Sequence, residues 1–456
     1  MPPSIALTFC FMFIIILLLY DTKRENKASS ELWVPTIWFL VIASRPVNLI
    51  LNPAGMAFGA SEEGNLINQI VDATLIALSI LILFRRKPSI HNVVMDNKYI
   101  FIFYLFCGIS ILWSDYPFVS LKRYIKSIGN ILIIFILFTE SDPVSSINTV
   151  IRRCAYVFVP LSICLIKYFP LYGRAYNQWT GELMITGAAD DKNALGRICM
   201  VLCLFYSWQL LYEIKNNNIF RDNKEKIIHI SILIMTIWML IKAHSATAIF
   251  CFTVGFITMI VLKAPFFRER AENVIVYIAI TALVLYFIDY LFNIREFIVV
   301  SLGRNMTFTE RDILWKTLWN MDTDPLIGTG FESFWLGDRF EYVLNKLGYG
   351  PIEAHNGYLE IYLNLGIIGG VLFVALIISC YLNIRKKFME NYNFSVISTA
   401  LFVVFLFYNI TESATRGTYI LWTIFLVTNI DYKCLLPIRY ELNDVSIINE
   451  TYSHFI

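Results

Sequence analysis

Repeated apolar runs, each nearly long enough to cross a bilayer, restrict most strongly what this chain can fold into. The hydrocarbon core of a membrane takes about 20 apolar residues per helix. About thirteen runs approach that length, and the weakest, at 33–51 and 124–138, are short or interrupted by Arg45 and Lys126. The sequence therefore predicts an all-α, polytopic membrane helical bundle of about 12–13 transmembrane helices. The predicted spans are 4–20, 33–51, 66–84, 98–113, 124–138, 151–170, 194–212, 227–243, 247–262, 274–292, 356–380, 396–411 and 418–431.

Connections rich in Lys and Arg alternate with connections that have few, which predicts how the bundle is oriented in the membrane. Short loops rich in Lys and Arg mark the cytoplasmic side of a membrane protein. On that rule the N-terminus lies outside and the C-terminus inside, and the connection 52–65, which has no Lys or Arg, is external. The basic internal groups are Lys23/Arg24/Lys27, Arg85/Arg86/Lys87, Arg152/Arg153, Lys215/Arg221/Lys224/Lys226, Lys263/Arg268/Arg270 and Arg385/Lys386/Lys387.

The same order divides the chain into one membrane domain with two non-spanning parts. We expect residues 1–456 to form a single transmembrane domain, with 293–355 as a large extracytoplasmic loop and 432–456 as a cytoplasmic tail. Long connections of this kind are usually functional. The apolar run from Ile5 to Tyr20 has no basic segment before it and no small-residue cleavage site, so we expect a retained helix and not a signal peptide.

Composition excludes several classes of protein. The chain is 57% hydrophobic and 16% charged, against roughly 25% charged residues in soluble domains. Its basic residues are scattered through short loops, so no nucleic-acid partner is expected. Most cysteines lie within apolar runs and are expected to be plain buried thiols. Motifs of zinc peptidases, ATPases and nucleophile-elbow hydrolases are missing, and Asp322-Thr323-Asp324 beside Pro325 favours a turn over a metal site.

Arg311 is the most unusual charge in the predicted outer loop. Thr309 and Asp312 indicate a capping box that opens a short helix. In that helix Arg311 lies in the middle of an apolar arc, at a terminus whose dipole disfavours a cation. An external anion is therefore the expected partner, because guanidinium offers phosphate a planar donor fork. The alternative is an arginine that snorkels to the interface beside tryptophans. The arc is Leu314, Trp315, Leu318 and Trp319.

His355 stands at the predicted entrance of the span at 356–380. Pro351 and Gly357 flank it, so it is held at a membrane–water boundary. A histidine with an ordinary pKa near 6.5 can accept a proton at neutral pH, and Glu353 and Glu360 are other candidate bases nearby. The alternative is a histidine that donates to a backbone carbonyl at a helix entrance.

A second basic group lies at the start of the span at 194–212. Lys192 and Arg197 flank this helix start, and Asn193 is the predicted N-cap. Two cations at a helix N-terminus favour an anion, whereas ordinary boundary charges near lipid headgroups are the alternative.

Several of these outer segments together resemble the O-antigen ligase and O-antigen polymerase superfamily, especially its exopolysaccharide-polymerase-like branch. Each segment is weak alone, but their order and common side make the set more specific, and they cover most of the chain from about residue 100. They are SDYPFVSLKR at 114–123, DDKNALG at 190–196, HSATA at 244–248, LGRNMTFTERDILW at 302–315, PLIGTGFESFW at 325–335, EAHNGYLEIYLNLGIIGG at 353–370 and NITES at 409–413.

The resemblance implies a GT-C-like membrane glycosyltransferase that moves glycan from a polyprenyl diphosphate carrier to an acceptor sugar. It needs no metal and no cofactor. Arg311, with Arg304, Lys192 and Arg197, would hold the diphosphate, and His355 would deprotonate or orient the acceptor hydroxyl. Glu310 departs from the pattern, since a Gly is expected before the arginine. Together with Arg304, Lys192 and Arg197, the expected substrate-binding residues are Asn193, Asn356 and Glu412.

Three functions remain open at this stage. Polymerisation of exopolysaccharide or O-antigen repeats is favoured, with a lipid-linked oligosaccharide and an acceptor glycan as partners at the outer face of a bacterial inner membrane. An O-antigen ligase would instead transfer glycan to a lipid A core. A transporter or flippase of lipid-linked oligosaccharide should carry ionisable groups near the bilayer midplane, and few are visible; in a non-catalytic assembly or signalling protein the outer polar set would be incidental.

Overall fold

The computed structural model confirms an all-α membrane bundle. The structure describes residues 1–24, 29–51, 65–176, 181–213, 223–268, 311–417 and 419–431, with 270, 273 and 276 as single residues. Its helices are α1 (Pro3–Arg24), α2 (Trp33–Ala43), α3 (Val47–Leu51), α4 (Leu66–Arg86), α5 (Ile90–Asp96), α6 (Lys98–Ile109), α7 (Pro117–Phe138), α8 (Pro143–Tyr168), α9 (Pro170–Gly173), α10 (Lys192–Trp208), α11 (Asn223–Lys242), α12 (Ala246–Lys263), α13 (Pro265–Arg268), α16 (Arg311–Trp319), α17 (Gly337–Leu347), α18 (Gly357–Lys387), α19 (Tyr392–Thr411) and α20 (Ile420–Asn429).

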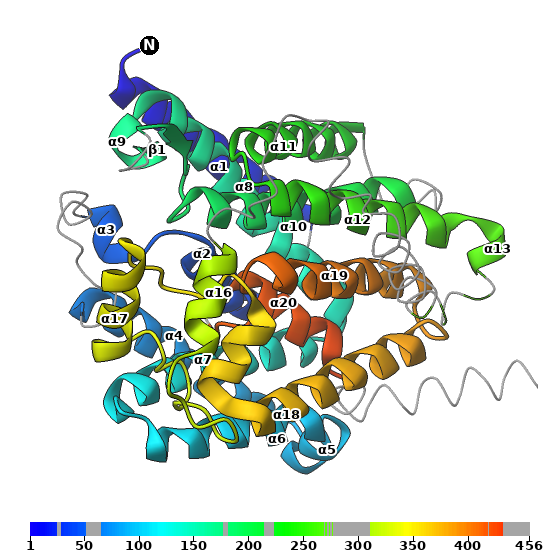
Figure 1. Cartoon of the computed structure of the whole chain (residues 1–456). Coiled ribbons are helices and arrows are strands. Elements are labelled where there is room, and N and C mark those ends of the chain that lie inside the picture. Colours follow the sequence, from blue (N-terminus) through cyan, green and yellow to red (C-terminus); the bar gives the residue numbers. More distant parts are fainter. Residues whose placement is uncertain are drawn as a thin grey trace, which may run out of the picture.

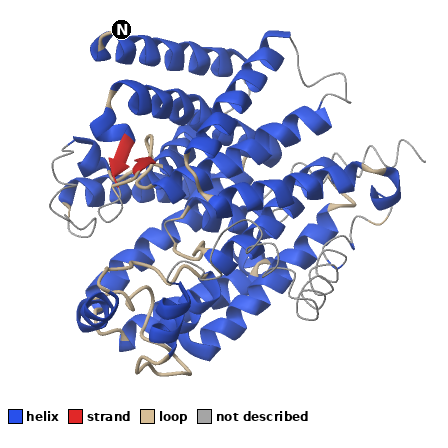
Figure 2. Ribbon diagram, turned by 45° about the horizontal axis from the view of Figure 1, so that its top comes forward, coloured by secondary structure: helices blue, strands red, loops and turns tan. Residues whose placement is uncertain are grey.

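Within the described ranges, strand structure is confined to one small hairpin (Figure 2). Strand β1 (Arg174–Tyr176) pairs antiparallel with β2 (Leu183–Ile185) in the connection between α9 and α10. Short 3-10 turns at Ser30–Leu32 and Ser110–Trp113 and a π-helical turn at Gln209–Glu213 extend α2, α6 and α10.

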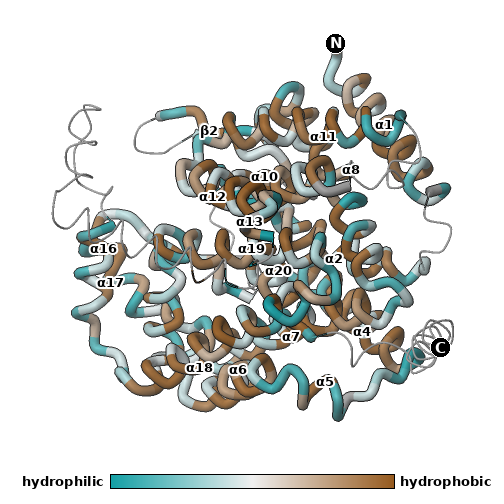
Figure 3. Tube along the Cα trace, turned by 90° about the vertical axis from the view of Figure 1, so that its right-hand side faces the viewer, coloured by the Kyte–Doolittle hydropathy of each residue, from teal (hydrophilic) through white to brown (hydrophobic). Residues whose placement is uncertain are grey.

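The helices have the length and the outer surface of membrane spans. Seven helices in the described part of the chain are long and apolar enough to cross a bilayer, and three shorter apolar ones accompany them. On α1 the outward residues Phe9, Met12 and Ile16 are more than half exposed, as expected for side chains that face lipid. Figure 3 shows the corresponding hydrophobic stretches along α18, whereas α16 and α17 are more hydrophilic. The chain is therefore a multi-pass helical membrane protein.

The count of 12–13 spans stays a prediction, and one predicted span is divided. The run 274–292 falls outside the described residues, except for residue 276. The run 33–51 forms two helices, because α2 ends at Ser44 and Pro46 disfavours helical backbone in the residue before it. Arg45 turns at this break to donate to the carbonyl oxygens of Gly187 and Ala189, at 3.0 and 2.7 Å.

Helix α10 occupies the centre of the bundle and carries almost no exposed side chain. It packs against α11, α12, α19 and α20, while α1 and α4 lie at the periphery (Figure 1). Its cysteines, Cys199 and Cys203, are buried free thiols among apolar neighbours. All eight described cysteines are free; seven of them are buried, as predicted, whereas Cys10 is half-buried.

Polar contacts join neighbouring segments at each end of the bundle. At one end Asp21 accepts from Arg152 and Arg153, which joins α1 to α8. At the other end the backbone N–H of Phe331 donates to Ser110, next to α6. Each pair joins segments to which the loop charges assign the same side, while the orientation of the two ends in the cell stays a prediction.

Helix α18 is broken at Gly366, and a segment of the connection between α16 and α17 fills the break. Gly366 has φ +63° and ψ −164°, so the helical ladder stops there. The freed N–H groups of Ile367 and Ile368 donate to the carbonyls of Pro325 and Leu326, at 2.9 and 3.1 Å. In return, the N–H of Gly330 donates to the carbonyl of Asn364 at 2.8 Å. This exchange fixes the loop that leads from α16 to the entrance of α18.

We predict that Gly366→Ala destabilises the protein by about 1–3 kcal/mol, the range for a residue held in a rare backbone region. A Cβ there would lie 2.3 Å from the backbone of Leu326. Thermal unfolding in detergent measures the effect. Gly370→Ala is the matched control, because its Cβ would meet no atom within 4 Å, and an equal midpoint for both variants would contradict the account.

Candidate functional site at one end of the bundle

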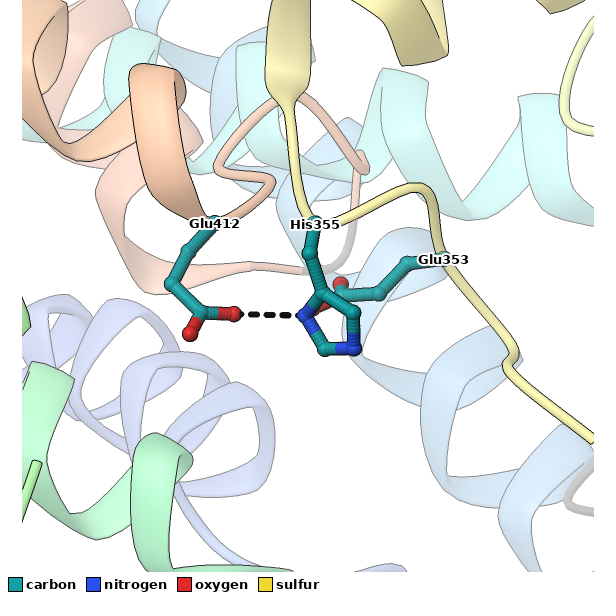
Figure 4. A group of neighbouring side chains, drawn as sticks. All are labelled: Glu353, His355 and Glu412. Atoms are coloured by element: carbon teal, nitrogen blue, oxygen red, sulfur yellow. Dashed lines mark hydrogen bonds and ion pairs between the residues drawn. The ribbon is translucent and has the colours of Figure 1, made fainter. Parts of the chain in front are cut away.

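Three residues from two distant segments form the centre of the site. His355 lies just before α18, and Glu412 is the residue at which α19 ends. His355 Nδ1 lies 2.8 Å from an oxygen of Glu412 and 3.2 Å from an oxygen of Glu353 (Figure 4). His355 has a left-handed φ of +49°, which turns the chain between Glu353 and the first turn of α18. Two carboxylates therefore share one ring nitrogen.

Arg311 joins this centre from helix α16. Its Nη2 donates to the second carboxylate oxygen of Glu412 at 2.7 Å, and its Nη1 donates to the carbonyl of Thr411. Arg311, for which an external anion was predicted, is thus already paired with a carboxylate of the protein. Leu314 and Leu318 of the predicted arc are buried and turn one face of α16 inward, whereas Trp319, which was predicted to share that face, is 67% exposed. The Arg311 side chain as a whole is 21% exposed, so it is not closed off from a ligand.

Glu412 faces protein side chains, which corrects its predicted role in substrate binding. Its side chain is 4% exposed, and one oxygen meets Arg311 while the other meets His355. It bridges the two residues that sequence reasoning had placed in one site, and we therefore treat it as a positioning residue.

A second group of cations lies against Glu353. The guanidinium carbon of Arg197 lies 3.9 Å from the centre of the Tyr419 ring, and that of Arg416 lies 5.9 Å from the same centre. The Tyr419 hydroxyl donates to Glu353 at 3.1 Å. Arg416 also donates to the carbonyl of Ile352 at 2.8 Å. Arg197 thus reaches the centre of the site through Tyr419, whose role was not predicted.

The predicted anion site at the start of α10 is occupied by an acidic cap. Asp191, and not Asn193, is the N-cap: its carboxylate accepts from the N–H groups of Asn193 and Ala194 at 2.6 and 2.9 Å. A carboxylate already satisfies the donors that an external anion would use. Lys192 and Asn193 are half-buried beside it and have no contact to His355 in the described structure. The N-cap prediction for Asn193 is therefore wrong, while the substrate-binding roles of Lys192 and Asn193 stay predictions.

Asn356 is the N-cap of α18, and its role in substrate binding stays a prediction. Its side-chain oxygen accepts from the N–H groups of Tyr358 and Leu359, both at 3.0 Å. The backbone of Ala354, two residues earlier, makes two hydrogen bonds. Its N–H donates to Glu360 at 2.9 Å, and its carbonyl accepts from the Trp315 side chain at 2.8 Å. These bonds fix the segment that carries His355. Arg304 and Thr309 lie outside the described residues.

The charges around His355 favour its protonated form. Burial lowers the pKa of His355, but the hydrogen bonds and charges of Glu353 and Glu412 outweigh it and raise that pKa to about 9. Burial raises the pKa of Glu353, and His355, Arg416 and Arg197 together lower it to about 2. At neutral pH the site thus holds an imidazolium between two carboxylates, so His355 is not the ready proton acceptor that an ordinary pKa would make it.

Glu353, His355 and Glu412 are also close enough to hold a metal ion by distance alone. One donor atom from each lies within 4.8 Å of the others. However, Glu412 already accepts from Arg311 and His355, and Glu353 accepts from Tyr419. The surrounding guanidinium groups would oppose a divalent cation at this position. A proton fits this donor set better than a metal ion.

The fold and the site define a multi-pass helical membrane protein with a cation-rich histidine site at one end of its bundle. Residues 230–374 match the model of the family described as O-antigen ligase. The chain is also 20% identical over 309 residues to the exopolysaccharide production protein ExoQ of Rhizobium meliloti (strain 1021). That similarity covers 64% of this chain and 66% of the relative. Together these findings support an O-antigen ligase/polymerase-like family.

The family match covers α16 and the entrance of α18, and hence Arg311 and His355. It ends before Glu412, Arg416 and Tyr419, which lie beyond residue 374. The residues that complete the site therefore lie outside the matched region, Arg197 before it and Glu412, Arg416 and Tyr419 after it.

We predict that His355 makes stability depend on pH with a defined sign. Its pKa is about 9 in the folded protein and about 6.5 when unfolded, so the stability it contributes is complete below about pH 6.5. That contribution is lost as the pH rises through 9. The fall in melting temperature between pH 6 and pH 9 should be smaller in His355→Gln than in the unchanged protein. His91→Gln, at an exposed position on α5, serves as control; equal falls in all three proteins would refute the expectation.

Proposed function

We propose that this chain is a membrane glycosyltransferase that moves glycan from a polyprenyl-diphosphate carrier to an acceptor sugar at the extracytoplasmic face. The observation that carries the proposal is the meeting of Arg311 and His355 on the two oxygens of Glu412. These residues are far apart in sequence, and each was predicted to act on a different part of the same reaction. Their contact through one buried carboxylate supports a single reaction centre.

The arrangement supplies what transfer from a lipid diphosphate requires. The acceptor oxygen forms a bond to the anomeric carbon, and the bond from that carbon to the diphosphate breaks with its electron pair going to the leaving oxygen. Fixed cations can neutralise the charge that develops there. Arg311 is the partly exposed guanidinium placed for this task, and Arg197 and Arg416 add positive charge on the other side of His355. Arg304 is proposed as a further contact from the predicted outer loop.

Polymerisation of exopolysaccharide or O-antigen repeats is the proposed form of the reaction. The similarity to an exopolysaccharide production protein favours it. The family model described as O-antigen ligase favours the second candidate, a ligase that transfers glycan to a lipid A core. The two reactions share the donor and differ only in the acceptor, so the size and identity of the product decide between them.

A flippase is the competing class, and the ionisable pairs inside the bundle do not favour it. Lys126 on α7 and Asp72 on α4 lie 3.0 Å apart, and Asp21 on α1 accepts from Arg152 and Arg153 on α8. Each group of charges links neighbouring helices, α4 with α7 and α1 with α8. The pairs thus serve helix packing, whereas a transport path would place such groups along a water-filled cavity.

We predict that Arg311→Ala and His355→Ala reduce glycan transfer by about 10²–10³-fold, the loss typical of removing one stabilising donor from a transition state. Arg311→Lys should lie between, because it keeps the charge and loses the donor fork. The assay combines purified protein with lipid-linked repeats from cells that lack this chain, with and without lipid A core, and sizes the products.

Arg85→Ala is the matched control, since Arg85 is highly exposed at the opposite end of the bundle. A ladder formed from lipid-linked repeats alone supports the polymerase, and product only with the core acceptor supports the ligase. Full transfer by both alanine variants, or translocation of lipid without any new glycosidic bond, would reject the enzyme.

We predict that the site faces outward. Lys346 on α17 is exposed beside the outer loop, so a cysteine at this position should react with a membrane-impermeant maleimide in intact spheroplasts. The described native cysteines are mostly buried and provide a low background. Labelling only after the membrane is opened would place the site in the cytosol and overturn the orientation.

A further inference from the structure

The position of Glu353 and Glu412 around His355 has a consequence for how the histidine acts. Both carboxylates approach the same nitrogen, Nδ1, at 3.2 and 2.8 Å. The other ring nitrogen, Nε2, lies on the far edge of the ring in Figure 4 and has no partner among the described residues. Nδ1 must carry a proton to donate to either carboxylate, so Nε2 is the atom that can meet a substrate.

The groups that face His355 decide whether Nε2 carries a proton as well. Two carboxylates in direct contact with one edge of the ring stabilise a positive charge on the ring. The guanidinium groups nearby are already engaged, Arg311 with Glu412 and Arg197 with Tyr419. The charged and titratable groups around the ring are Glu353 from its own segment, Glu412, Arg416 and Tyr419 from the segment after α19, Arg311 from α16 and Arg197 from α10.

We propose that His355 acts as an imidazolium that donates its Nε2–H to the leaving diphosphate, and that it does not remove the proton of the acceptor. The inference rests on the proposed function and assigns the histidine a part in it that sequence reasoning had not given. Glu412 is then the positioning residue that holds this cation beside Arg311, so that two fixed donors meet one diphosphate.

The reaction remains balanced without a histidine base. The acceptor oxygen bonds to the anomeric carbon, the diphosphate leaves with the electron pair of the broken C–O bond, and the acceptor proton is released to water. Glycosyl transfer passes through a transition state with oxocarbenium character. Most of the new negative charge therefore develops on the diphosphate, where two cations stabilise it.

The pKa of about 9 agrees with this geometry, because His355 then stays charged at neutral pH and loses its charge only above that value. A base and a cation predict opposite pH dependence. The activity of a base rises as the pH passes its pKa, whereas the contribution of a cation is lost over the same interval.

The experiment measures glycan transfer and the binding of polyprenyl diphosphate in lipid nanodiscs between pH 6 and pH 10. We expect both to be constant below about pH 8.5, and transfer to fall about tenfold per pH unit above 9. His355→Gln should lose about 10²-fold in transfer at pH 7 and bind the diphosphate about tenfold more weakly. His355→Lys should recover a measurable part of both, because it restores a cation and cannot act as a base below its own high pKa.

Glu412→Gln separates the charge of His355 from its presence in the protein. Removing one carboxylate should lower the pKa of His355 and move the alkaline loss of activity to lower pH. His91→Gln should reproduce the profile of the unchanged protein. Each variant is compared at equal folded fraction, measured by thermal unfolding.

Two results would overturn the inference. One is transfer that rises with pH through 9 while His355→Lys is as inactive as His355→Gln. The other is diphosphate binding whose strength does not change with pH or with the charge at position 355. If binding shows the expected loss but no glycosidic bond forms at any pH, the contact stands and the proposed function fails instead.

Discussion

The carboxylate of Glu412 is the interaction on which the site depends. One oxygen fixes a guanidinium that arrives from the outer loop, and the other fixes the imidazole at the entrance of α18. Because Glu412 is almost fully buried, both bonds form away from bulk water, where a charge-assisted hydrogen bond is stronger. Loss of either partner would leave one oxygen of a buried carboxylate without its donor, so the three groups are expected to stay together.

The position of Glu412 relative to His355 depends on contacts between the end of α19 and the start of α18. Asn409, which is buried on α19, accepts the N–H of Ala414 at 2.8 Å and lies against Gly357, where a Cβ would come within 1.8 Å of its side chain. Position 357 therefore needs a glycine, because the end of α19 and the start of α18 touch there. This close contact places Glu412 within hydrogen-bond distance of His355. The hydrogen bonds of Trp315 and Glu360 to Ala354 fix the segment that carries His355.

The sequence allowed the helical membrane bundle to be predicted, because hydropathy is a local signal, and Arg311 and His355, which were predicted for one site, lie together on Glu412. The break at Pro46 was also visible locally, yet a continuous apolar run concealed it. Asp191 was missed as the N-cap because Asn193 is an equally good capping residue, and only backbone geometry separates them. The partners of Glu353 could not be predicted: Arg197 and Tyr419 lie more than 200 residues apart, and their stacking depends on how α10 meets the segment before α20.

The break at Gly366 divides α18 into unequal parts. The part from Ile367 to Lys387 has about 20 residues, which at 1.5 Å per residue is about 30 Å, the thickness of the hydrocarbon core by itself. The shorter part that begins at Gly357 is thus spare length, and a lipid-facing surface on α18 starts only at Ile367 and Ile368. A chain built this way can keep its histidine in the aqueous headgroup layer, level with the phosphates of a lipid whose tail never has to leave the membrane.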